Sequence, residues 1–444
     1  MHIRDTTEQD HQVFLETVHT AFGIFLETPT EAGGLWWSAI EMDRGVLAIA
    51  ANGRAVGTAS AYSFELTLPG GATMPVGGVN AVSVLPTYRR QGVLTAMMRH
   101  QLTTLRARGE AIAVLMCSEA VIYRRYGYGP ATFSEHLTVD AARSTFAPAR
   151  SAFAPAGSGF APAGSGFAPA GSAFAPARSA FASARSAFAS AGSGTTAPAG
   201  EVEVLAREAC GELLEEVYDR YRRARPGALS RPRRWWASRA GEPPISPAPR
   251  YVLVHRDADG TPDGYASYVI EHGVMTVDEV IALGDETAAT LSRFLLGHDL
   301  VSKIVFKHVP ADDPLRWQLA DFRAARPAGT GDALWLRLLD VPTALTARGW
   351  LTDGELVLDV EDEFLGEHHR YLLTIRDGKA ACVPTDQEPD PSLDISDLGS
   401  IYLGGAVPST LVRAGHIRAH NPAAAARTDR LFQTELLPHC VHRF

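Results

Sequence analysis

The sequence predicts an α/β protein, α+β in the arrangement of its elements, that is divided into several units with mixed sheets. Segments with the two-residue period of strands alternate with segments that have the period of amphipathic helices. The chain has 444 residues, and at roughly 150 residues per domain this length suggests two or three domains. A low-complexity repeat interrupts the pattern between residues 145 and 200. These observations predict separate folded units on either side of an insert.

Residues 1–144 form the first predicted unit. The segment "GVNAVSV" alternates apolar residues and predicts a strand, which Pro86 ends because proline has no N–H for the strand ladder. A buried strand, "AIAVLMCS", begins at residue 111. Between them, after Gly92, apolar residues recur at the spacing of a helix with one apolar face: Leu94, Met97, Met98, Leu102 and Leu105. The turn "RRQG" therefore joins a strand to a helix.

This turn combines three features of an anion site. The N-terminus of a helix has free N–H groups and a partial positive charge. Gly92 lets a phosphate group approach the backbone, and Arg89 and Arg90 add positive charge and paired donors. The turn predicts a seat for a diphosphate; the alternative is a basic, solvated helix cap.

The repeat at residues 145–200 has phenylalanine every seven residues, from Phe146 to Phe188, in units such as "SGFAPAG". One large apolar residue per unit, with proline and glycine between, does not make a coiled coil. Such a composition cannot bury enough area to offset chain entropy. The repeat predicts a disordered insert; the alternative is a segment whose phenylalanines bind to a surface.

Residues 201–328 predict a second α/β unit. Leu213, Leu214 and Val217 lie on one face of a helix that ends before Pro226. Three strands, a helix and a further strand follow: "RYVLVHR", "DGYASYVI", "VMTVDEVIAL", "AATLSRFLLGHDL" and "VSKIVFKHV". Residues 329–444, whose first strand is "DALWLRLLDV", predict a third unit of strands and helices with a short extended terminus.

Composition limits the class of protein. A net charge of −9 argues against a general nucleic-acid binder, so we interpret "RYRRARPGALSRPRRWW" as helix-end packing and subunit contact. The four cysteines have no zinc or redox spacing, and "HCVH" has no matching second half of a metal site. The N-terminus is polar and no run approaches the roughly 20 apolar residues of a membrane span. We expect a cytoplasmic protein without metal, membrane span or nucleic-acid partner.

The whole chain resembles the Eis (enhanced intracellular survival) family of GCN5-related N-acetyltransferases (GNAT). The resemblance excludes the insert and lies in "VLPTYRRQGVLTAM", "SEAVIYRRYGYGPAT", "ARPGALSRPRRWW", "WLRLLDVPTALTARGW", "LGSIYLGG" and the terminal "HRF", in this order. Leu94 departs from the small residue of the general GNAT phosphate turn. The resemblance implies tandem GNAT-like mixed-sheet domains, at residues 1–144 and, degenerate, at 201–328. A sterol-carrier-protein-like α+β domain would follow at 329–444, in a homo-hexamer.

The resemblance also implies an activity. Family members are acetyl-CoA-dependent N-acetyltransferases that act by direct transfer on primary amines of aminoglycosides, polyamines or lysine side chains. We therefore expect acetyl-CoA as co-substrate, a cationic amine as acceptor and no metal. The alternative, from another class, is a non-catalytic protein with a decayed acetyltransferase fold that binds CoA or an apolar ligand.

Site residues follow from the same resemblance. Tyr123 would be the general acid, with Tyr126 and Tyr128 as alternatives. The carboxylate of Phe444 would be the general base, although an ordinary C-terminus is the simpler interpretation of the sequence alone. Positions expected to contact acetyl-CoA are Val82, Ser83, Val84, Arg89, Arg90, Gln91, Gly92, Val93, Leu94, Thr95, Ser118 and Glu119.

The acceptor amine would contact Trp36, whose indole face can bind a cation, and Glu27. A core tryptophan is the alternative for Trp36. Ile24 and Arg443 stand where polyamine-binding members have acidic groups. These two departures argue against strong aminoglycoside binding and leave amine acetylation as the expected activity.

Overall fold

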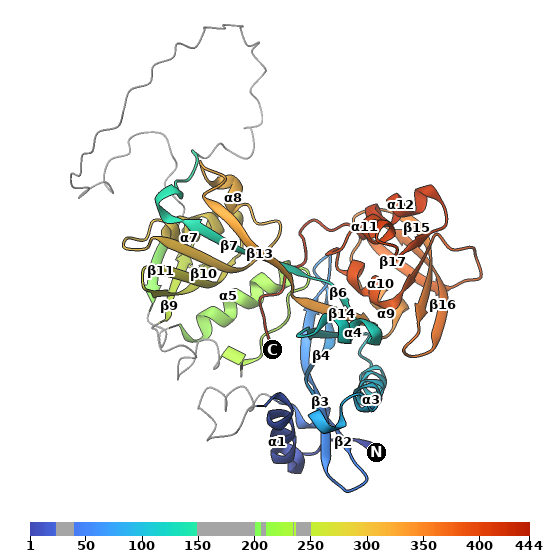
Figure 1. Cartoon of the computed structure of the whole chain (residues 1–444). Coiled ribbons are helices and arrows are strands. Elements are labelled where there is room, and N and C mark those ends of the chain that lie inside the picture. The colour runs from blue at the N-terminus through green and yellow to red at the C-terminus, as the bar shows by residue number, and fades with distance from the viewer. Residues whose placement is uncertain (24–39, 149–199, 206–209, 234, 237–249) are drawn as a thin grey trace, which may run out of the picture.

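The structure, a computed structural model, describes the chain except residues 24–39, 149–199, 206–209, 234 and 237–249. The strands of the described residues form three sheets, each with its own helices (Figure 1). Most of the predicted insert lies outside the described residues, and so do Ile24, Glu27 and Trp36.

The first sheet carries the strand–turn–helix unit that the sequence predicts. Its strand order is β1-β2-β3-β4-β5-β14-β6. Phe14 of α1 shares a buried cluster with Tyr62, whereas Met98 of α3 shares one with Ala61. Because neighbouring residues of a strand point to opposite faces, α1 and α3 cover opposite faces of the sheet. The elements are β1 (His2–Asp5), α1 (His11–Phe22), β2 (Val46–Ile49), β3 (Ala55–Thr67), β4 (Thr73–Val84), α3 (Val93–Ala107), β5 (Ile112–Met116), α4 (Ala120–Tyr123), β6 (Gly129–Pro130) and β14 (Leu334–Leu338).

The second sheet repeats the central part of the first. β11 and β12 are parallel neighbours, as β4 and β5 are, and α7 connects them. The strand order is β13-β7-β12-β11-β10-β9-β8. The elements are β7 (Phe133–Asp140), β8 (Glu201–Leu205), α5 (Gly211–Ala224), β9 (Arg250–Arg256), β10 (Pro262–Glu271), β11 (Val274–Ala282), α7 (Asp285–Leu296), β12 (Lys303–Val309), α8 (Leu315–Gln318) and β13 (Ala325–Asp332).

The third sheet is smaller and lies against the first domain. Its order is β17-β16-β15-β18-β19, and the residues of α10 are all buried because the helix packs between this sheet and β14. The elements are α9 (Val341–Ala347), β15 (Gly354–Asp362), β16 (Glu367–Arg376), β17 (Lys379–Pro384), β18 (Pro391–Asp394), α10 (Ile395–Tyr402), α11 (Pro408–Arg413), β19 (Arg418–Ala419) and α12 (Pro422–Phe432).

Two strands cross the predicted domain boundaries. β7 belongs by sequence to the predicted first domain, 1–144, but it pairs with β12 and β13 in the second sheet. β14 belongs to the predicted third domain, 329–444, but it pairs with β5 and β6 in the first sheet. The predicted boundaries therefore do not separate the sheets, because the pattern of a strand shows which faces are buried and not which strand is its neighbour.

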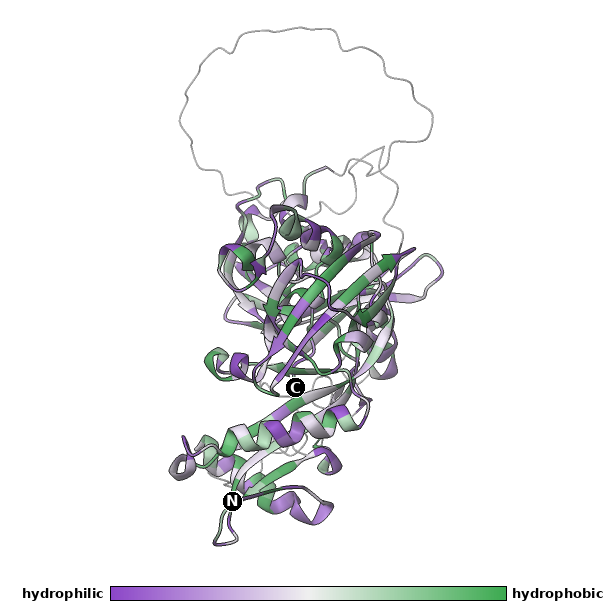
Figure 2. Ribbon diagram, turned by 90° about the vertical axis from the view of Figure 1, so that its right-hand side faces the viewer, coloured by the Kyte–Doolittle hydropathy of each residue, from purple (hydrophilic) through white to green (hydrophobic). Residues whose placement is uncertain are grey.

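The chain ends inside the molecule. Figure 1 and Figure 2 both show the C-terminus between the first sheet and the second domain. In the part of the chain that the structure describes, no helix combines the length and the apolar character that a membrane crossing needs.

Candidate active site

The two parallel strands β4 and β5 separate after a short pairing. Residues 77–79 of β4 pair with residues 113–115 of β5. Ala81 then has a φ of 48°, and the register with β3 shifts between Thr58 and Ser60. This bulge turns β4 away from β5. The backbone edge of Val82, Ser83 and Val84 on the β5 side is therefore available to an added extended chain.

A cavity of about 810 Å³ lies where β4 and β5 separate. It lies between the end of β4, the N-terminus of α3 and the segment that follows β5. All the predicted acetyl-CoA positions line it except Gln91, whose Nε2 donates to the Thr87 carbonyl at 3.1 Å. The lining residues from the predicted set are Val82, Ser83, Val84, Arg89, Arg90, Gly92, Val93, Leu94, Thr95, Ser118, Glu119 and Tyr123.

The turn before α3 presents its backbone to this cavity. Gly92 is the N-cap residue with a φ of 80°, which glycine adopts without steric cost. The Ala96 N–H donates to the Gly92 carbonyl at 3.0 Å, so the N–H groups of Val93, Leu94 and Thr95 precede the first intrahelical bond of the helix. Free N–H groups and the positive end of the helix dipole suit a phosphate group.

The two arginines of the turn differ in role. The Arg89 guanidinium donates to the carbonyls of Val84 at 3.2 Å and Ala21 at 2.9 Å, so it ties the turn to β4 and α1. Arg90 is exposed at the cavity with a φ of 60°. We expect Arg90 to supply the larger share of the charge that a diphosphate would meet.

Tyr123 points into the same cavity from α4. Its side chain is 9% exposed, and burial, with smaller contributions from Cys117 and Tyr126, raises the pKa of its phenol to about 12. The Tyr126 hydroxyl also lines the cavity, 3.3 Å from Thr95 Oγ1. Tyr128 is fully buried against Tyr123, with ring centroids 6.2 Å apart. Of the three phenols, Tyr123 and Tyr126 therefore line the cavity and Tyr128 does not.

The C-terminal tail is fixed between domains. Residues 438–442 are buried, the His439 N–H donates to the Pro226 carbonyl at 2.8 Å, and the Leu437 N–H donates to Asp312 Oδ2 at 2.7 Å. Burial lowers the pKa of His439 to about 3, so this imidazole is neutral. These contacts hold the tail in one path, unlike the frayed end of most chains.

The tail brings Phe444 to the middle of β3 and β4. The Phe444 ring lies 4.9 Å from the Phe64 ring and 6.2 Å from the Tyr62 ring. A Cβ at Gly78 would lie 3.1 Å from the Phe444 ring and 2.5 Å from the Phe64 ring. The last residue therefore fits where β4 has no side chain.

Phe444 and Tyr123 lie on opposite faces of the first sheet. Ala61 and Val79 are paired across β3 and β4 and share a buried cluster with Tyr123. Their neighbours Tyr62 and Gly78 are also paired, and these contact the Phe444 ring. Because strand side chains alternate between faces, Tyr123 and Phe444 lie on opposite faces of β3 and β4. Phe444 does not line the 810 Å³ cavity.

The remaining predicted residues lie either outside the described part of the chain or near its C-terminus. Glu27 and Trp36 lie outside the described residues, as does Ile24, so their predicted roles rest on the sequence. Arg443 is exposed beside the terminus. In "HCVH", the His442 ring packs on Phe64 at 5.2 Å, and within the described residues no group of three ligand-type side chains could hold a metal ion.

Sequence reasoning missed several cavity residues, among them Tyr88, Ile122 and Arg125. Arg125 stacks on the Tyr126 ring at 5.1 Å and donates to the Ile122 carbonyl at 3.2 Å. The sequence offered one indication of this residue, because Arg125 is the second arginine of "YRRYGYG", close to the predicted acid. The bulge at Ala81 had no signal, because alanine rarely adopts a positive φ.

Comparisons with known proteins agree with this geometry. The acetyltransferase (GNAT) domain family matches residues 2–131, and a second acetyltransferase (GNAT) domain family matches residues 227–338. The sterol carrier protein domain family matches residues 341–441. The N-acetyltransferase Eis of Mycobacterium tuberculosis is 32% identical over 390 residues, which cover 86% of this chain and 84% of that protein. The chain belongs to the Eis family of N-acetyltransferases.

Other relatives of this Eis-family protein extend the match. An uncharacterized N-acetyltransferase of Streptomyces coelicolor is 33% identical over 96% of this chain and 95% of its own. The crystal structure of Eis1 from Mycobacterium abscessus has a TM-score of 0.79 and 30% identity, with full coverage of both chains. These matches confirm the predicted fold class, two GNAT domains followed by a sterol-carrier-protein-like domain, and the prediction that the chain is an acyltransferase.

Proposed function

We propose that this Eis-family protein transfers an acetyl group from acetyl-CoA directly to a primary amine, with the carboxylate of Phe444 as base and Tyr123 as acid. GNAT acetyltransferases use acetyl-CoA, which supplies a thioester. The observation that carries the proposal is the buried tail, which brings the terminal residue to Gly78 on the face opposite Tyr123.

The residues present fit this donor. The free edge of Val82, Ser83 and Val84 would pair with an extended pantetheine arm, as an added strand does. The N-terminus of α3 and Arg90 would hold the diphosphate. The cavity of about 810 Å³ is of a size typical for a cofactor site.

The acceptor would approach from the face of the terminal carboxylate. An alkyl ammonium, with a reference pKa of about 10.4, must lose a proton before its nitrogen can attack. The Phe444 carboxylate would accept that proton. The new N–C bond forms as the C–S bond breaks, and the Tyr123 phenol gives its proton to the departing sulfur. The acetylated nitrogen then loses its second proton, which restores the phenol, and the Phe444 carboxyl group releases the first proton to water. The products are an N-acetylated amine and free CoA thiol.

The surroundings of Tyr123 keep the phenol in its acid form. Burial raises the pKa of the Cys117 thiol to about 11, and that of Tyr123 beside it to about 12. Burial disfavours the charged form of both groups, so a departing thiolate in the same surroundings would be destabilised together with the phenolate. The phenol would therefore be protonated when the thiolate leaves, and it could supply the proton.

The acceptor class is an amine of an aminoglycoside, a polyamine or a lysine side chain. The exposed cation Arg443, next to the proposed base, argues for acceptors with few positive charges near the reacting nitrogen. A homo-hexameric assembly and a cytoplasmic location remain predictions from the sequence and the resemblance.

The test is to move the terminal carboxylate. A chain extended by three residues after Phe444, and a chain that ends at Arg443, are assayed by release of free thiol from acetyl-CoA with lysine peptides, polyamines and aminoglycosides. We expect at least about a hundredfold lower turnover for the extended chain, because general base catalysis typically contributes this much. Donor affinity, measured by calorimetry, should stay unchanged.

The matched control carries the same three residues before Met1 and should keep full turnover. Full turnover of the C-terminally extended chain would overturn the role of Phe444. Failure of the unaltered protein to release thiol with every amine would overturn the transferase proposal and favour a donor-binding protein.

A further inference from the structure

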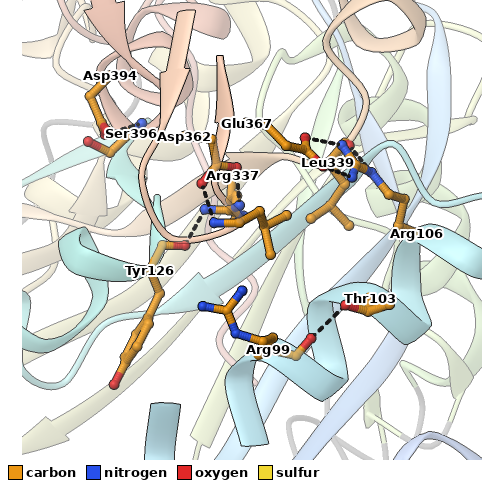
Figure 3. Close-up of polar contacts among 11 residues, drawn as sticks. Arg99, Thr103, Arg106, Tyr126, Arg337, Leu339, Asp362, Glu367, Asp394 and Ser396 are labelled. Atoms are coloured by element: carbon orange, nitrogen blue, oxygen red, sulfur yellow. Dashed lines mark hydrogen bonds and ion pairs between the residues drawn. The ribbon is translucent and has the colours of Figure 1, made fainter. Parts of the chain in front are cut away.

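A hairpin of the third domain reaches the wall of the donor cavity. The turn at residues 362–367 joins β15 to β16 and lies against α3 (Figure 3). Arg106 of α3 donates to both carboxylate oxygens of Glu367, at 2.6 and 2.9 Å, and to the Leu339 carbonyl at 2.6 Å. Such a bidentate contact fixes orientation as well as distance. The hairpin is therefore tied to the helix whose N-terminus lines the cavity.

Phe364 is the residue of this turn that faces the cavity wall. Its ring lies 4.9 Å from the Tyr126 ring in an edge-on arrangement, and the Arg99 guanidinium lies 4.7 Å above it. Tyr126 lines the cavity, and its hydroxyl is 3.3 Å from Thr95 at the start of α3. Phe364, which does not itself line the cavity, thus packs against a residue that does.

Arg337 on β14 holds the same segment through its guanidinium. Its side chain is fully buried, and its guanidinium donates to the Tyr126 carbonyl and to Asp362 (Figure 3). Asp362 also accepts the Leu365 N–H at 3.1 Å, which orders the turn that carries Phe364. A Cβ on Gly127, whose φ is +79°, would clash with Arg337 Nη1. Only glycine therefore fits at position 127 beside the Arg337 guanidinium.

The supported segment carries the proposed acid. Tyr123 ends α4, and a 3-10 turn at Arg124–Tyr126 continues it. The Tyr128 N–H donates to the Tyr123 carbonyl at 3.3 Å, which links the ends of this short segment. A shift of Tyr126 toward an empty space at Phe364 would therefore move the Tyr123 phenol. A displacement of about 1 Å at a reacting group can cost up to about a hundredfold in rate.

We propose that Phe364 is a positioning residue for acetyl transfer, and that the hairpin of the sterol-carrier-protein-like domain sets the place of the Tyr123 phenol. This inference rests on the proposed role of Tyr123 as acid. The third domain then contributes to the reaction twice, through the terminal carboxylate and through this hairpin on the opposite face of the sheet.

The experiment is a double-mutant cycle on the full chain, with Phe364→Ala, Tyr123→Phe and the double variant. We expect Phe364→Ala to lower kcat about tenfold with the KM for acetyl-CoA within about twofold. In the Tyr123→Phe background the same change should cost nothing further, because the phenol that Phe364 positions is absent. Phe364→Leu, which keeps an apolar body, should recover most of the loss.

Two controls separate this role from a structural one. Glu363→Ala, at an exposed position of the same turn, should leave kcat unchanged. An equal loss from Phe364→Ala in both backgrounds, or no loss in either, would overturn the inference while the role of Tyr123 stands. Wild-type turnover of Tyr123→Phe alone would instead overturn the acid assignment. If Phe364→Ala does not fold, the cycle is run with Phe364→Val, which also removes the ring; a loss confined to the Tyr123 background supports the inference, and an equal loss in both backgrounds overturns it.

Discussion

The first and second domains have a cavity at the same place in the fold, but different residues start the helix beside it. In both, two parallel strands separate and a helix starts beside the gap: α3 after β4, and α7 after β11. Each gap holds a cavity, of about 810 Å³ in the first domain and about 220 Å³ in the second. The residue before each helix is a glycine, Gly92 or Gly284.

The difference lies in charge and backbone. Before α3 the turn carries Arg89 and Arg90, and Gly92 has a positive φ that aims the helix N–H groups at the cavity. α7 instead begins with Asp285 and Glu286. Their carboxylates neutralise the positive end of the helix dipole and repel a diphosphate. The fold supplies the gap, and the few residues of the turn decide whether it can take a nucleotide-containing donor.

The largest effect on acetyl-CoA affinity is expected from substitution of the two glycines, which should affect the two domains differently. A side chain on Gly92 or Gly284 meets no atom within 4 Å at its Cβ, so an indole at either position would extend into its cavity mouth. Gly92→Trp should abolish detectable acetyl-CoA binding in calorimetry, because the indole occupies the diphosphate seat. It also costs about 1–2 kcal/mol of stability, since φ at this position is +80°.

Gly284→Trp is the matched control and should leave acetyl-CoA affinity unchanged, with one donor bound per chain. Circular dichroism checks that both variants are folded. Undiminished affinity in Gly92→Trp, or loss of affinity in Gly284→Trp, would place the donor elsewhere.

The next effect concerns the proposed acid. Tyr123→Phe should lower turnover by at least about thirtyfold, since proton transfer by a positioned side chain contributes about 10²–10⁴-fold and water replaces part of it. The KM for acetyl-CoA should change little. Steady-state thiol release measures both quantities. Tyr126→Phe removes a hydroxyl with one long contact to Thr95 and should cost less than about threefold. The reverse order of the two losses would move the acid to Tyr126.

A smaller effect should follow from reversal of charge at the turn. Arg90→Glu should weaken acetyl-CoA binding by about tenfold to a hundredfold, because a charge-assisted hydrogen bond contributes about 1.5–3 kcal/mol. Asp285→Arg in the second domain should not create a second donor site, because the cavity is smaller and Gly284 has an extended backbone where Gly92 has a positive φ. Titration calorimetry gives affinity and stoichiometry for each. Two donors per Asp285→Arg chain would show that charge alone separates the domains.

The smallest expected effect concerns pH, because ionisation of Tyr123 should leave kcat unchanged across the ordinary assay range. Burial raises the pKa of Tyr123 to about 12, above its ordinary value of about 10. The raised pKa keeps the phenol protonated as pH increases, so kcat should show no fall from its ionisation between about pH 7 and 10. A loss of kcat with a midpoint near 10 that disappears in Tyr123→Phe would show that the phenol is not desolvated.

The local parts of the fold and site were predictable, and the long-range parts were not. The turn from Arg89 to Gly92 combines charge, glycine and helical spacing within a few residues, and each signal is local. The neighbours of β7 and β14 depend on pairing across the chain, which no local pattern encodes. The burial of Arg337 was equally invisible, because its partners Asp362 and Tyr126 are distant in sequence.

Because β14 pairs in the first sheet, the N-terminal domain cannot complete its sheet until late in synthesis. β5 has no partner on one side until β14 leaves the ribosome, about 220 residues after β5. At about 5–20 residues per second this takes roughly 10–40 s. Throughout that interval the nascent N-terminal domain has an open strand edge, which is a template for aggregation. A gene fragment that stops at residue 144 would leave this edge open permanently.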